Sequence, residues 1–509
     1  MVQRNVRMAD WVRIHARNSP HRPCLVTDEG VRSFGEVDRR VNRLAGELAR
    51  LGVGKGDRVA LFATDRPEYV ETLLACLALG AVYVPLNFRL ARPELQTLLT
   101  TAQARVLFFS DRYADMVRAL DVPGLVATVG YDSDAGDHAY DDLVARGEDR
   151  AIDVEVDDAD TVCLAFTSGT TALPKAVVHS QRMVKHLVTQ CLVDRRMTST
   201  TCHYTASPLF HVGGMNYVLA GIARGHASLI LPAFDPSTVA RWMASGELSD
   251  VFLVPTMISM LLEEEAVRTG DFSALRSIGY GGAPMSPALL RRAMAVFDCD
   301  FLNMFGSTEG GCSATLGPED HRLALAGREH LLGSIGRAVT GVDLRVCDDD
   351  LREVADGEVG ELVFRADATM DGYLGRPDAT AEVLVDGRLR TGDLAHRDAD
   401  GYLYLAGRRK DMIIRGGENV YPLEIEDVLT EHPACREVAV VGVPDDHWGE
   451  IVRAHVVVGD GARFDEDDVR AWCRSRLAGF KVPALFVVAD ALPRNAGGKV
   501  LKRELRRQP

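Results

Sequence analysis

The segment Phe166-Thr-Ser-Gly-Thr-Thr-Ala-Leu-Pro-Lys175 gathers hydroxyl side chains, a glycine and a lysine into one short loop. Hydroxyls and backbone N–H groups in such a loop can cradle a polyphosphate, and a lysine neutralises its charge. The spacing differs from that of a Walker loop, Gly-x-x-x-x-Gly-Lys-Ser/Thr. Because an isolated Ser/Thr/Gly cluster is often an ordinary turn, other motifs must support a phosphate site here.

The elements around this loop alternate between strands and helices. The run Val162–Phe166 leads into the loop and is typical of a buried strand. Upstream, the apolar runs Arg58–Ala63 and Arg105–Phe109 flank a helical pattern over Pro67–Leu79, which begins with proline. This alternation predicts an α/β fold with mostly parallel sheets covered by helices.

The pattern changes after about residue 333, where Asp-Gly turns separate short strands. These turns are Asp356-Gly357, Asp386-Gly387 and Asp400-Gly401, and they predict a small antiparallel or barrel-like subdomain. A new unit begins after Gly407-Arg-Arg-Lys410. We therefore expect a large N-terminal domain over residues 1–408, a connection at 409–411 and a small α+β domain over 412–509.

Further motifs follow the phosphate loop in a fixed order: Pro208-Leu-Phe-His-Val-Gly-Gly214, Tyr280-Gly-Gly-Ala-Pro284, Asn303-Met-Phe-Gly-Ser-Thr-Glu309, Tyr373-Leu-Gly-Arg-Pro377, Arg390-Thr-Gly-Asp393, Gly407-Arg-Arg-Lys-Asp-Met-Ile-Ile414, Gly416-Gly-Glu-Asn-Val-Tyr-Pro422 and Pro493-Arg-Asn-Ala-Gly-Gly-Lys499. This ordered set resembles the adenylate-forming enzymes, which comprise acyl-CoA synthetases, adenylation domains of peptide synthetases and luciferases. The resemblance covers essentially the whole chain. It implies that a carboxylate attacks the α-phosphate of ATP, and that coenzyme A then attacks the acyl-AMP.

The resemblance implies roles for the adenylation residues. Lys499 bridges the carboxylate and the α-phosphate and offsets their charge. Glu309 helps to hold Mg²⁺, a hard cation that prefers oxygen ligands, and Thr308 donates to the α-phosphate. Asp393 accepts from the ribose hydroxyls. The implied ATP- or AMP-binding residues are Thr167, Ser168, Gly169, Thr170, Thr171, Lys175, Gly281, Gly282, Ala283, Pro284, Phe305, Gly306, Asp393 and Arg408.

The resemblance also implies an acyl site and a coenzyme A site. His211 lies at the entrance for the acyl carboxylate, and the acyl pocket comprises His211, Val212, Gly213, Met215, Gly310 and Gly311, with Gly214 and Cys312 adjoining. Lys410 is the hinge about which the small domain rotates between half-reactions. After that rotation Gly417 takes the place of Lys499 at the acyl centre, since a glycine pair lets backbone approach closely. The coenzyme A residues are Gly416, Gly417, Trp448, Phe480 and Lys481.

Two alanines depart from the family pattern in the phosphate loop. Ala172 and Ala176 stand where relatives carry glycine, so an added Cβ costs roughly 1–2 kcal/mol if positive φ or close approach is needed. Each 1.4 kcal/mol is about tenfold in rate. Because this loop holds the phosphates that leave before coenzyme A reacts, the damage should fall on adenylation. The alternatives are a complete ligase that tolerates both alanines, and an enzyme that takes acyl-AMP from a separate adenylating enzyme and performs only the thioester step.

The small residues of the acyl segments predict a bulky apolar acid of aryl, medium-chain or polycyclic type. No Lys or Arg stands beside these motifs in the sequence, which argues against a second carboxylate. Loading of a carrier protein is an alternative, which Trp448 and Phe480 disfavour. A silent nucleotide-binding regulator is another, which Lys499 disfavours.

Composition restricts the partners. Lys and Arg number 58 against 73 Asp and Glu, and the net charge of −15 disfavours a nucleic acid partner. The ten cysteines form no Cys-x-x-Cys pair or zinc-ligand spacing. The apolar stretch Leu73–Leu86 is interrupted and shorter than a membrane span. We therefore expect a cytoplasmic monomer or homodimer without integral membrane association.

Overall fold

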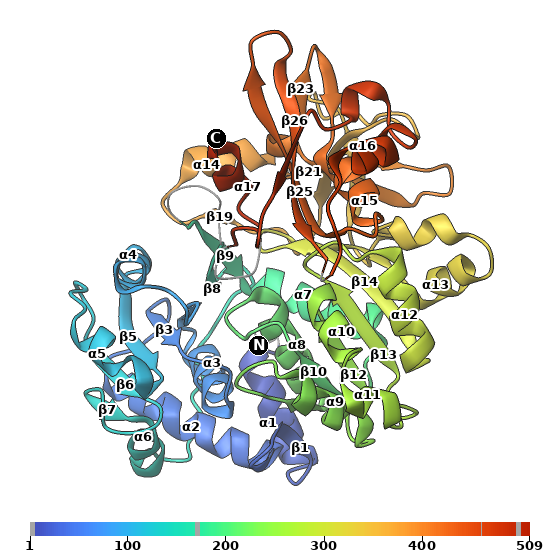
Figure 1. The fold of residues 1–509 in the computed structure, drawn as a ribbon. Helices are drawn as coiled ribbons and strands as arrows, with labels where there is room; N and C mark the ends of the chain where they lie inside the picture. Colours follow the sequence, from blue (N-terminus) through green and yellow to red (C-terminus); the bar gives the residue numbers. More distant parts are fainter. Residues whose placement is uncertain (1–5, 168–173, 460, 495–499, 509) are drawn as a thin grey trace.

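The computed structural model describes residues 6–167, 174–459, 461–494 and 500–508. In this part of the chain the strands form four sheets, and two large sheets lie side by side beneath the C-terminal part of the chain (Figure 1). The predicted strand–helix alternation and the change of pattern in the second half are both confirmed.

The sheet that leads to the phosphate loop has eight strands. Its order is β19 (Gly372–Tyr373), β9 (Ala176–Ser180), β8 (Thr161–Phe166), β4 (Val82–Pro85), β3 (Arg58–Phe62), β5 (Ala104–Phe109), β6 (Ala127–Gly130) and β7 (His138–Ala139). The pairs from β8 to β7 are parallel, whereas β9 runs antiparallel to both β8 and β19. The chain thus turns back after the phosphate loop to bring β9 beside β8.

The second large sheet has nine strands and supplies the remaining nucleotide motifs. Its order is β16 (Arg337–Ala338), β15 (Gly311–Leu316), β14 (Asp300–Ser307), β13 (Ser277–Gly281), β12 (Asp250–Leu253), β10 (Cys202–Thr205), β11 (Ala227–Leu229), β1 (Pro23–Thr27) and β2 (Gly30–Ser33). Strands β14, β13, β12 and β10 are parallel neighbours, so their carboxyl ends meet at one edge. In open parallel sheets such an edge is where ligands bind.

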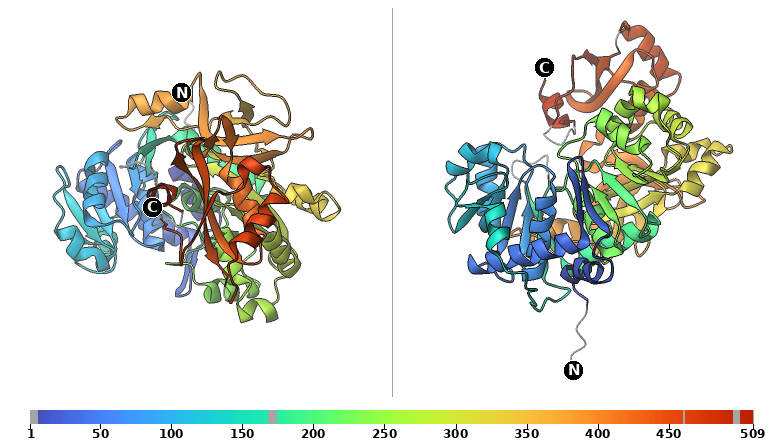
Figure 2. Two further views of the ribbon diagram at one scale, coloured as in Figure 1. Left: turned by 45° about the horizontal axis from the view of Figure 1, so that its top comes forward. Right: turned by 90° about the horizontal axis from the view of Figure 1, so that it is seen from below.

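Helices cover both large sheets (Figures 1 and 2). They are α1 (Met8–Asn18), α2 (Phe34–Arg50), α3 (Pro67–Leu79), α4 (Arg92–Ala102), α5 (Ala114–Arg118), α6 (Tyr140–Arg146), α7 (Gln181–Asp194), α8 (Val212–Arg224), α9 (Pro236–Ala244), α10 (Pro255–Leu261), α11 (Glu265–Thr269), α12 (Pro287–Phe297) and α13 (Pro318–Leu325). Helices α3 and α8 belong to one hydrophobic core that also includes residues of both sheets. Helix α3 is buried on nearly all its faces, and its sequence is mostly apolar; its two buried carboxylates, Glu68 and Glu71, are paired with arginines.

The third sheet is the predicted antiparallel subdomain. It contains β17 (Asp343–Cys347), β18 (Gly360–Arg365), β21 (Arg388–Arg397) and β20 (Leu384–Val385), with β22 (Leu403–Arg408) paired to β21 and α14 (Pro377–Val383) beside it. Asp386 and Gly387 both have positive φ, 50° and 70°, and Val385 pairs with Arg388. This is the two-residue hairpin turn that an Asp-Gly pair favours.

The fourth sheet lies in the C-terminal part of the chain, at the top of Figure 1. It contains β24 (Glu418–Val420), β23 (Ile413–Arg415), β26 (Gly449–Val458) and β25 (Cys435–Asp445), with β27 (Leu485–Val488) paired to β26. Helices α15 (Pro422–Thr430) and α16 (Glu466–Arg474) contribute to its core, and α17 (Lys502–Arg507) packs on its other face through Leu505.

Short 3-10 turns occur at Asp111–Tyr113, Glu329–Gly333, Arg409–Asp411 and Gly479–Lys481. All ten cysteines are unpaired. Across the described residues, no helix is both long enough and apolar enough to cross a membrane.

Candidate active site

Lys175, Tyr373 and Glu309 form a connected group beside the phosphate loop. Strand β19 pairs with β9, and this places Tyr373 beside the strand that follows Lys175. The Lys175 ammonium lies 4.5 Å from the centroid of the Tyr373 ring. The Tyr373 hydroxyl donates to Glu309 Oε1 at 2.9 Å, and the Met370 N–H donates to the Glu309 carbonyl at 2.9 Å. Burial and the neighbouring Glu309 carboxylate raise the pKa of Tyr373, so the phenol remains a donor.

The His179 side chain holds the backbone carbonyl of Thr308 by a hydrogen bond. It lies fully buried in β9, and its Nε2 is 2.8 Å from the Thr308 carbonyl oxygen. Because a carbonyl only accepts, Nε2 carries the hydrogen. Burial lowers the pKa of His179 to about 4, so the ring is neutral at pH 7. Thr308 and Glu309 are therefore held through His179, Met370 and Tyr373, and neither His179 nor the Tyr373 contact was predicted from the sequence.

The residues predicted to bind adenine lie at the carboxyl ends of β13 and β14. At Gly281 a Cβ would lie 2.3 Å from the Met304 carbonyl oxygen, and at Gly306 it would lie 2.0 Å from the Gly311 carbonyl oxygen. These close approaches explain both glycines. Gly282 has a φ of +78°, and Ala283 and Pro284 follow it. Phe305 lies on β14, half-buried.

A histidine that the motifs do not contain supports these residues. The Tyr280 hydroxyl is 2.9 Å from His321 Nε2, and His321 Nδ1 is 2.7 Å from the Gly317 carbonyl oxygen. The carbonyl fixes the hydrogen on Nδ1, so Nε2 accepts from Tyr280. Burial lowers the pKa of His321, which favours this neutral form.

The predicted ribose residues are paired with each other. Asp393 and Arg408 are opposite one another in the β21–β22 ladder, and Arg408 Nε lies 2.7 Å from Asp393 Oδ1. The Asp393 N–H donates to the Thr391 hydroxyl at 3.0 Å. The ion pair with Arg408 and the Thr391 contact hold the buried Asp393 carboxylate between β21 and β22.

His211 precedes α8 and is largely enclosed. Its ring centroid lies 4.3 Å from that of Phe210, with the rings tilted by 44°, and the Phe210 ring meets Phe88 edge-on at 5.6 Å. Burial, and then the charge of Arg89, lower the pKa of His211 to about 4. Arg89 comes from the segment after β4, far away in the sequence. A cation therefore does lie near the acyl segments, contrary to the expectation from the motifs alone.

Asp65 lies close to the same entrance. Its Oδ1 accepts from the Leu209 N–H at 2.9 Å, and burial raises the pKa of its carboxyl to about 7, against the opposing effect of Arg89. The sequence contains no motif that marks Asp65, because its contact joins the β3–α3 connection to the turn before α8.

The small residues of the acyl segments are closely packed. A Cβ on Gly310 would lie 2.0 Å from the Phe364 ring, and a Cβ on Gly311 would lie 1.9 Å from Leu187. Gly214 approaches the carbonyls of Ser207 and Pro208 in the same way. Only Gly213 is comparatively open, with the Ser207 hydroxyl at 3.2 Å. Val212 and Met215 join the core between the two large sheets. These glycines therefore permit close packing and do not by themselves leave a large open pocket.

Gly416, Gly417 and the two predicted aromatics lie together in the C-terminal part of the chain. The Gly416 N–H donates to the Trp448 carbonyl at 2.8 Å, and a Cβ on Gly416 would lie 2.8 Å from the indole ring. Both glycines have positive φ, 60° and 87°. Arg415 links the aromatics, because its charge lies 5.7 Å from the Trp448 ring and its Nη1 donates to the Phe480 carbonyl at 2.6 Å.

Trp448 and Phe480 expose 46% and 37% of their surface. These are large values for aromatic side chains on a well-packed domain, and they suit rings that stack on a ligand. Lys481 is not a free cation, since its Nζ lies 2.7 Å from both carboxylate oxygens of Glu424. A phosphate at Lys481 would have to share it with Glu424.

Lys410 lies in the 3-10 turn between β22 and β23, where burial lowers its pKa. The adjacent Asp411 pairs with Arg506 of α17 at 2.9 Å, and Arg506 also reaches the Lys410 carbonyl at 3.4 Å. The predicted hinge is thus tied to the helix that closely follows position 499. Lys499 itself, and Ser168, Gly169, Thr170, Thr171 and Ala172, lie outside the described residues.

Ala176 is the first residue of β9. It pairs with Phe166 in the antiparallel ladder, and its carbonyl accepts from the Leu374 N–H at 2.9 Å. Its backbone is therefore extended, and positive φ gives no reason for strain at this position. The Thr167 N–H donates to the Lys175 carbonyl at 3.0 Å and closes the base of the loop.

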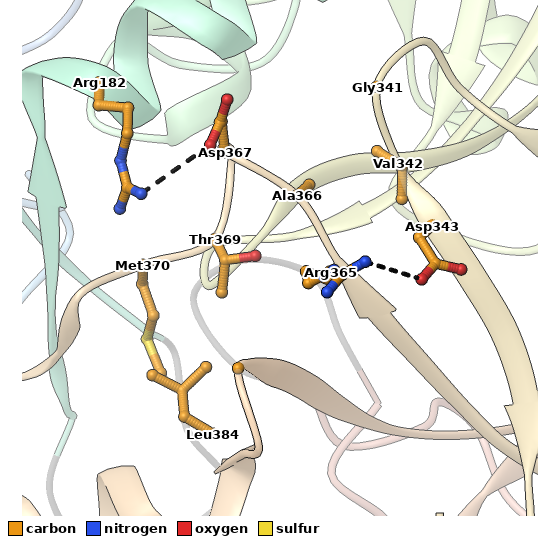
Figure 3. A pocket seen from close by; sticks show the side chains of 11 residues that line it. Arg182, Gly341, Val342, Asp343, Arg365, Ala366, Asp367, Thr369, Met370 and Leu384 are labelled. Atoms are coloured by element: carbon orange, nitrogen blue, oxygen red, sulfur yellow. Dashed lines mark ion pairs between the residues drawn. The ribbon is translucent and has the colours of Figure 1, made fainter. Parts of the chain in front are cut away.

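Two hollows lie beside the strand of Tyr373. The larger, of about 790 Å³, is lined by charged side chains that pair with one another, Arg182 with Asp367 at 3.9 Å and Arg365 with Asp343 at 3.7 Å (Figure 3). The smaller, of about 450 Å³, is lined by Tyr373 and Arg376. Both hollows adjoin Glu309, because Met370 lines the larger one and Tyr373 the smaller one, and both residues bond to Glu309.

Comparison with known proteins gives matches along the whole chain. Residues 12–374 match the AMP-binding enzyme family, and residues 424–499 match the AMP-binding enzyme C-terminal domain. A feruloyl-CoA synthase from Amycolatopsis sp is 38% identical over 506 residues, which is 99% of each chain. A fatty acid–acyl-carrier-protein ligase from Streptomyces coeruleorubidus is 36% identical over 97% of this chain and 94% of its own.

A solved structure agrees with these matches. The o-succinylbenzoate-CoA synthetase from Bacillus subtilis, in complex with its acyl-adenylate intermediate, is 29% identical, covers 98% of both chains and superposes with a TM-score of 0.87. Both family models and full-length relatives thus agree with the ordered motifs, and the chain belongs to the AMP-binding enzyme family of acyl-CoA ligases.

Proposed function

We propose that this protein converts a bulky apolar carboxylic acid to its coenzyme A thioester through an acyl-adenylate, using ATP and Mg²⁺. The observation that carries the proposal is the unit of Gly416, Trp448 and Phe480. It combines a glycine pair at positive φ with two exposed rings linked by Arg415. This combination suits a narrow thiol channel that ends on an aromatic platform for the coenzyme A adenine.

For the adenylation step, Lys175 supplies positive charge beside the phosphate loop. Glu309 fits a hard cation, because it is a carboxylate oriented by the Tyr373 hydroxyl. Mg²⁺, when bound, neutralises phosphate charge. His179 holds the Thr308 carbonyl, and the Thr308 hydroxyl would donate to the α-phosphate. Asp393 and Arg408 would orient the ribose, and Lys499 would draw the carboxylate to the α-phosphate.

For the thioester step, we propose that residues 412–509 rotate about Lys410, so that Gly417 replaces Lys499 at the acyl carbon. His211 lies at the entrance for the acyl carboxylate, and its lowered pKa keeps the ring neutral there. The Arg506–Asp411 pair joins the hinge to α17, so the segment that carries Lys499 moves with the hinge.

A second candidate is an enzyme limited to the thioester step, which takes acyl-AMP from a separate adenylating enzyme. Ala172 and Ala176 favour it, since a Cβ at either position reduces room for phosphate. Ala176 is buried at the base of the loop, where close approach rather than backbone strain is the relevant cost.

Loading of a carrier protein is a third candidate, and the fatty acid–acyl-carrier-protein ligase among the relatives favours it. The exposed Trp448–Phe480 platform favours coenzyme A instead, because a carrier protein presents its pantetheine arm without the adenine ring that such a platform would stack.

Two assays separate these functions. In the first, a panel of apolar acids is mixed with ATP, Mg²⁺ and coenzyme A, and thioesters and pyrophosphate are measured by mass spectrometry and a coupled assay. In the second, synthetic acyl-AMP and coenzyme A are supplied without ATP. We expect thioester in both. Thioester from acyl-AMP alone would establish the second candidate, and acyl-AMP without any thioester would overturn the proposal.

Replacing Tyr373 by phenylalanine tests the support of Glu309. The substitution keeps the ring beside Lys175 and removes only the hydroxyl that bonds to the carboxylate. A hydrogen bond to a charged group contributes about 1.5–3 kcal/mol, so we expect pyrophosphate release to fall roughly tenfold or more at limiting Mg²⁺. Thioester formation from acyl-AMP should stay within about twofold. An equal loss in both assays would show a general packing defect instead.

A further inference from the structure

Tyr217 lies at the inner end of the acyl segment on α8. It follows Gly213 by four residues, so the two share one face of the helix. Its ring centroid is 5.4 Å from that of Phe252 at the end of β12, and its hydroxyl is 2.9 Å from Met304 Sδ on β14. From His211 to Tyr217 the helix rises about 9 Å. Tyr217 is itself buried, with 4% of its surface exposed, in the core that also holds Met215, so an acid tail that follows this face from His211 meets the Tyr217 hydroxyl where a core side chain gives way.

A buried arginine fixes the direction of the Tyr217 hydroxyl. The Arg195 side chain is completely enclosed, and its Nη1 donates to the Tyr217 oxygen at 2.7 Å. The tyrosine oxygen is therefore an acceptor toward Arg195, and its own hydrogen must point elsewhere. A hydroxyl that accepts from a charged group is a stronger donor.

The neighbours of Arg195 provide the space for its guanidinium and balance its charge. At Gly279 on β13, a Cβ would lie only 1.7 Å from Arg195 Nη1, so the guanidinium can occupy this position only beside a glycine. Nη2 of Arg195 pairs with Asp250 at 2.5 Å, which balances its charge. The buried ion pair thus orients the tyrosine and leaves no excess positive charge at the end of the acyl segment.

The Tyr217 hydroxyl currently meets a poor acceptor. Its hydrogen points to the thioether sulfur of Met304, which accepts only weakly. Met304 is half-buried, and an unbranched methionine side chain is readily displaced. A strong, oriented donor beside a displaceable thioether is the arrangement expected for a subsite whose natural acceptor comes from the ligand.

We propose that Tyr217 recognises a neutral oxygen acceptor on the acid, a carbonyl, ether or hydroxyl oxygen about 9 Å from the carboxylate, in place of the Met304 sulfur. The proposal rests on the acyl-CoA ligase function and specifies its substrate class. A second carboxylate does not fit, because Arg195 is already paired and the added anion would face Asp250. A fully apolar tail would bind but would leave the donor on its weak acceptor.

The test uses acids that differ only at the distal oxygen. One pair is para-methoxycinnamic and para-ethylcinnamic acid, in which a methylene replaces the oxygen; the other is a keto fatty acid of matching length and its deoxo form. Each acid is assayed with ATP and coenzyme A, or as synthetic acyl-AMP with coenzyme A. For the wild type we expect kcat/KM to favour the oxygenated acid by roughly tenfold in at least one pair.

The variant Tyr217→Phe should remove this preference. Its kcat/KM should fall roughly tenfold for the oxygenated acid and change little for the partner acid, because general damage to the pocket would affect both. Tyr131→Phe is the matched control, since it removes another buried hydroxyl, bonded at 3.0 Å to Thr72 of α3 where the segment after β6 meets that helix. Equal kcat/KM within each pair, or a preference that survives in Tyr217→Phe, overturns the proposal. Thioester from no acid at all would instead refute the ligase function.

Discussion

Replacing Gly416 by alanine should slow the thioester step by at least about tenfold, because two independent costs coincide at this residue. The φ of +60° is unfavourable for any residue with a Cβ. The new Cβ would also lie 2.8 Å and 3.1 Å from two carbons of the Trp448 ring, so the indole must shift. The expected result is a loss of kcat/KM for coenzyme A with unchanged pyrophosphate release from acid and ATP.

Two further glycines provide matched controls for this prediction. Gly401 has a φ of +82° in a turn of the third sheet with open space around it, so Gly401→Ala introduces strain alone, outside the site. Gly417 has a φ of +87° and also no atom within 4 Å of an added Cβ. If Gly416→Ala performs no worse than Gly401→Ala, the contact with Trp448 has no part in coenzyme A binding. If Gly417→Ala loses thioester activity while Trp448 stays in place, the glycine pair itself lines the channel.

Glu309→Gln is expected to reduce adenylation by at least about a hundredfold. The substitution preserves the shape of the side chain and its acceptor for the Tyr373 hydroxyl, but it removes the charge that a hard cation requires. The phosphates leave before coenzyme A reacts. Thioester formation from supplied acyl-AMP should therefore change by no more than about threefold, which a comparison of the two assays measures.

Glu319→Gln is the control for the loss of one negative charge. Glu319 is exposed and pairs with Arg196 at 2.8 Å on the surface, away from the nucleotide motifs, and such pairs contribute little. A wild type that releases no pyrophosphate from any acid, together with a Glu309→Gln variant that forms thioester normally, would show that the chain performs only the second half-reaction. Normal pyrophosphate release by Glu309→Gln would remove Glu309 from the cation site.

Much of the fold follows from local patterns in the sequence. The helix expected over Pro67–Leu79 has those bounds, and the strand expected at Arg58–Ala63 ends one residue earlier. The Asp386-Gly387 turn forms the expected hairpin. Proline at a helix start, apolar runs and Asp-Gly turns act within a few residues, so they are visible without tertiary structure.

The site residues also fall into two groups, those that stand in a local motif and those brought to the site only by tertiary contacts. Motif order alone predicts Glu309, Asp393 and Trp448 as site residues, because each stands in a short segment that can be recognised without tertiary structure. The residues that contact them, or that shift their pKa values, could not be predicted from the sequence. His179 reaches Thr308 across 129 positions, and Arg89 reaches His211 from another sheet connection.

Only the tertiary structure shows which side chains occupy the space beside the acyl segments. The glycines at 310 and 311 suggested room for a bulky acid, yet Phe364 and Leu187 fill the space beside them. The Arg195–Tyr217–Met304 contact joins three segments that carry no common motif. The sequence by itself therefore determined the family, the order of the nucleotide motifs and the two altered positions of the phosphate loop. Only the tertiary structure decided the shape of the pocket, because its side chains come from segments far apart in the sequence and contact one another only after those segments pack. A short stretch of sequence does not contain that information.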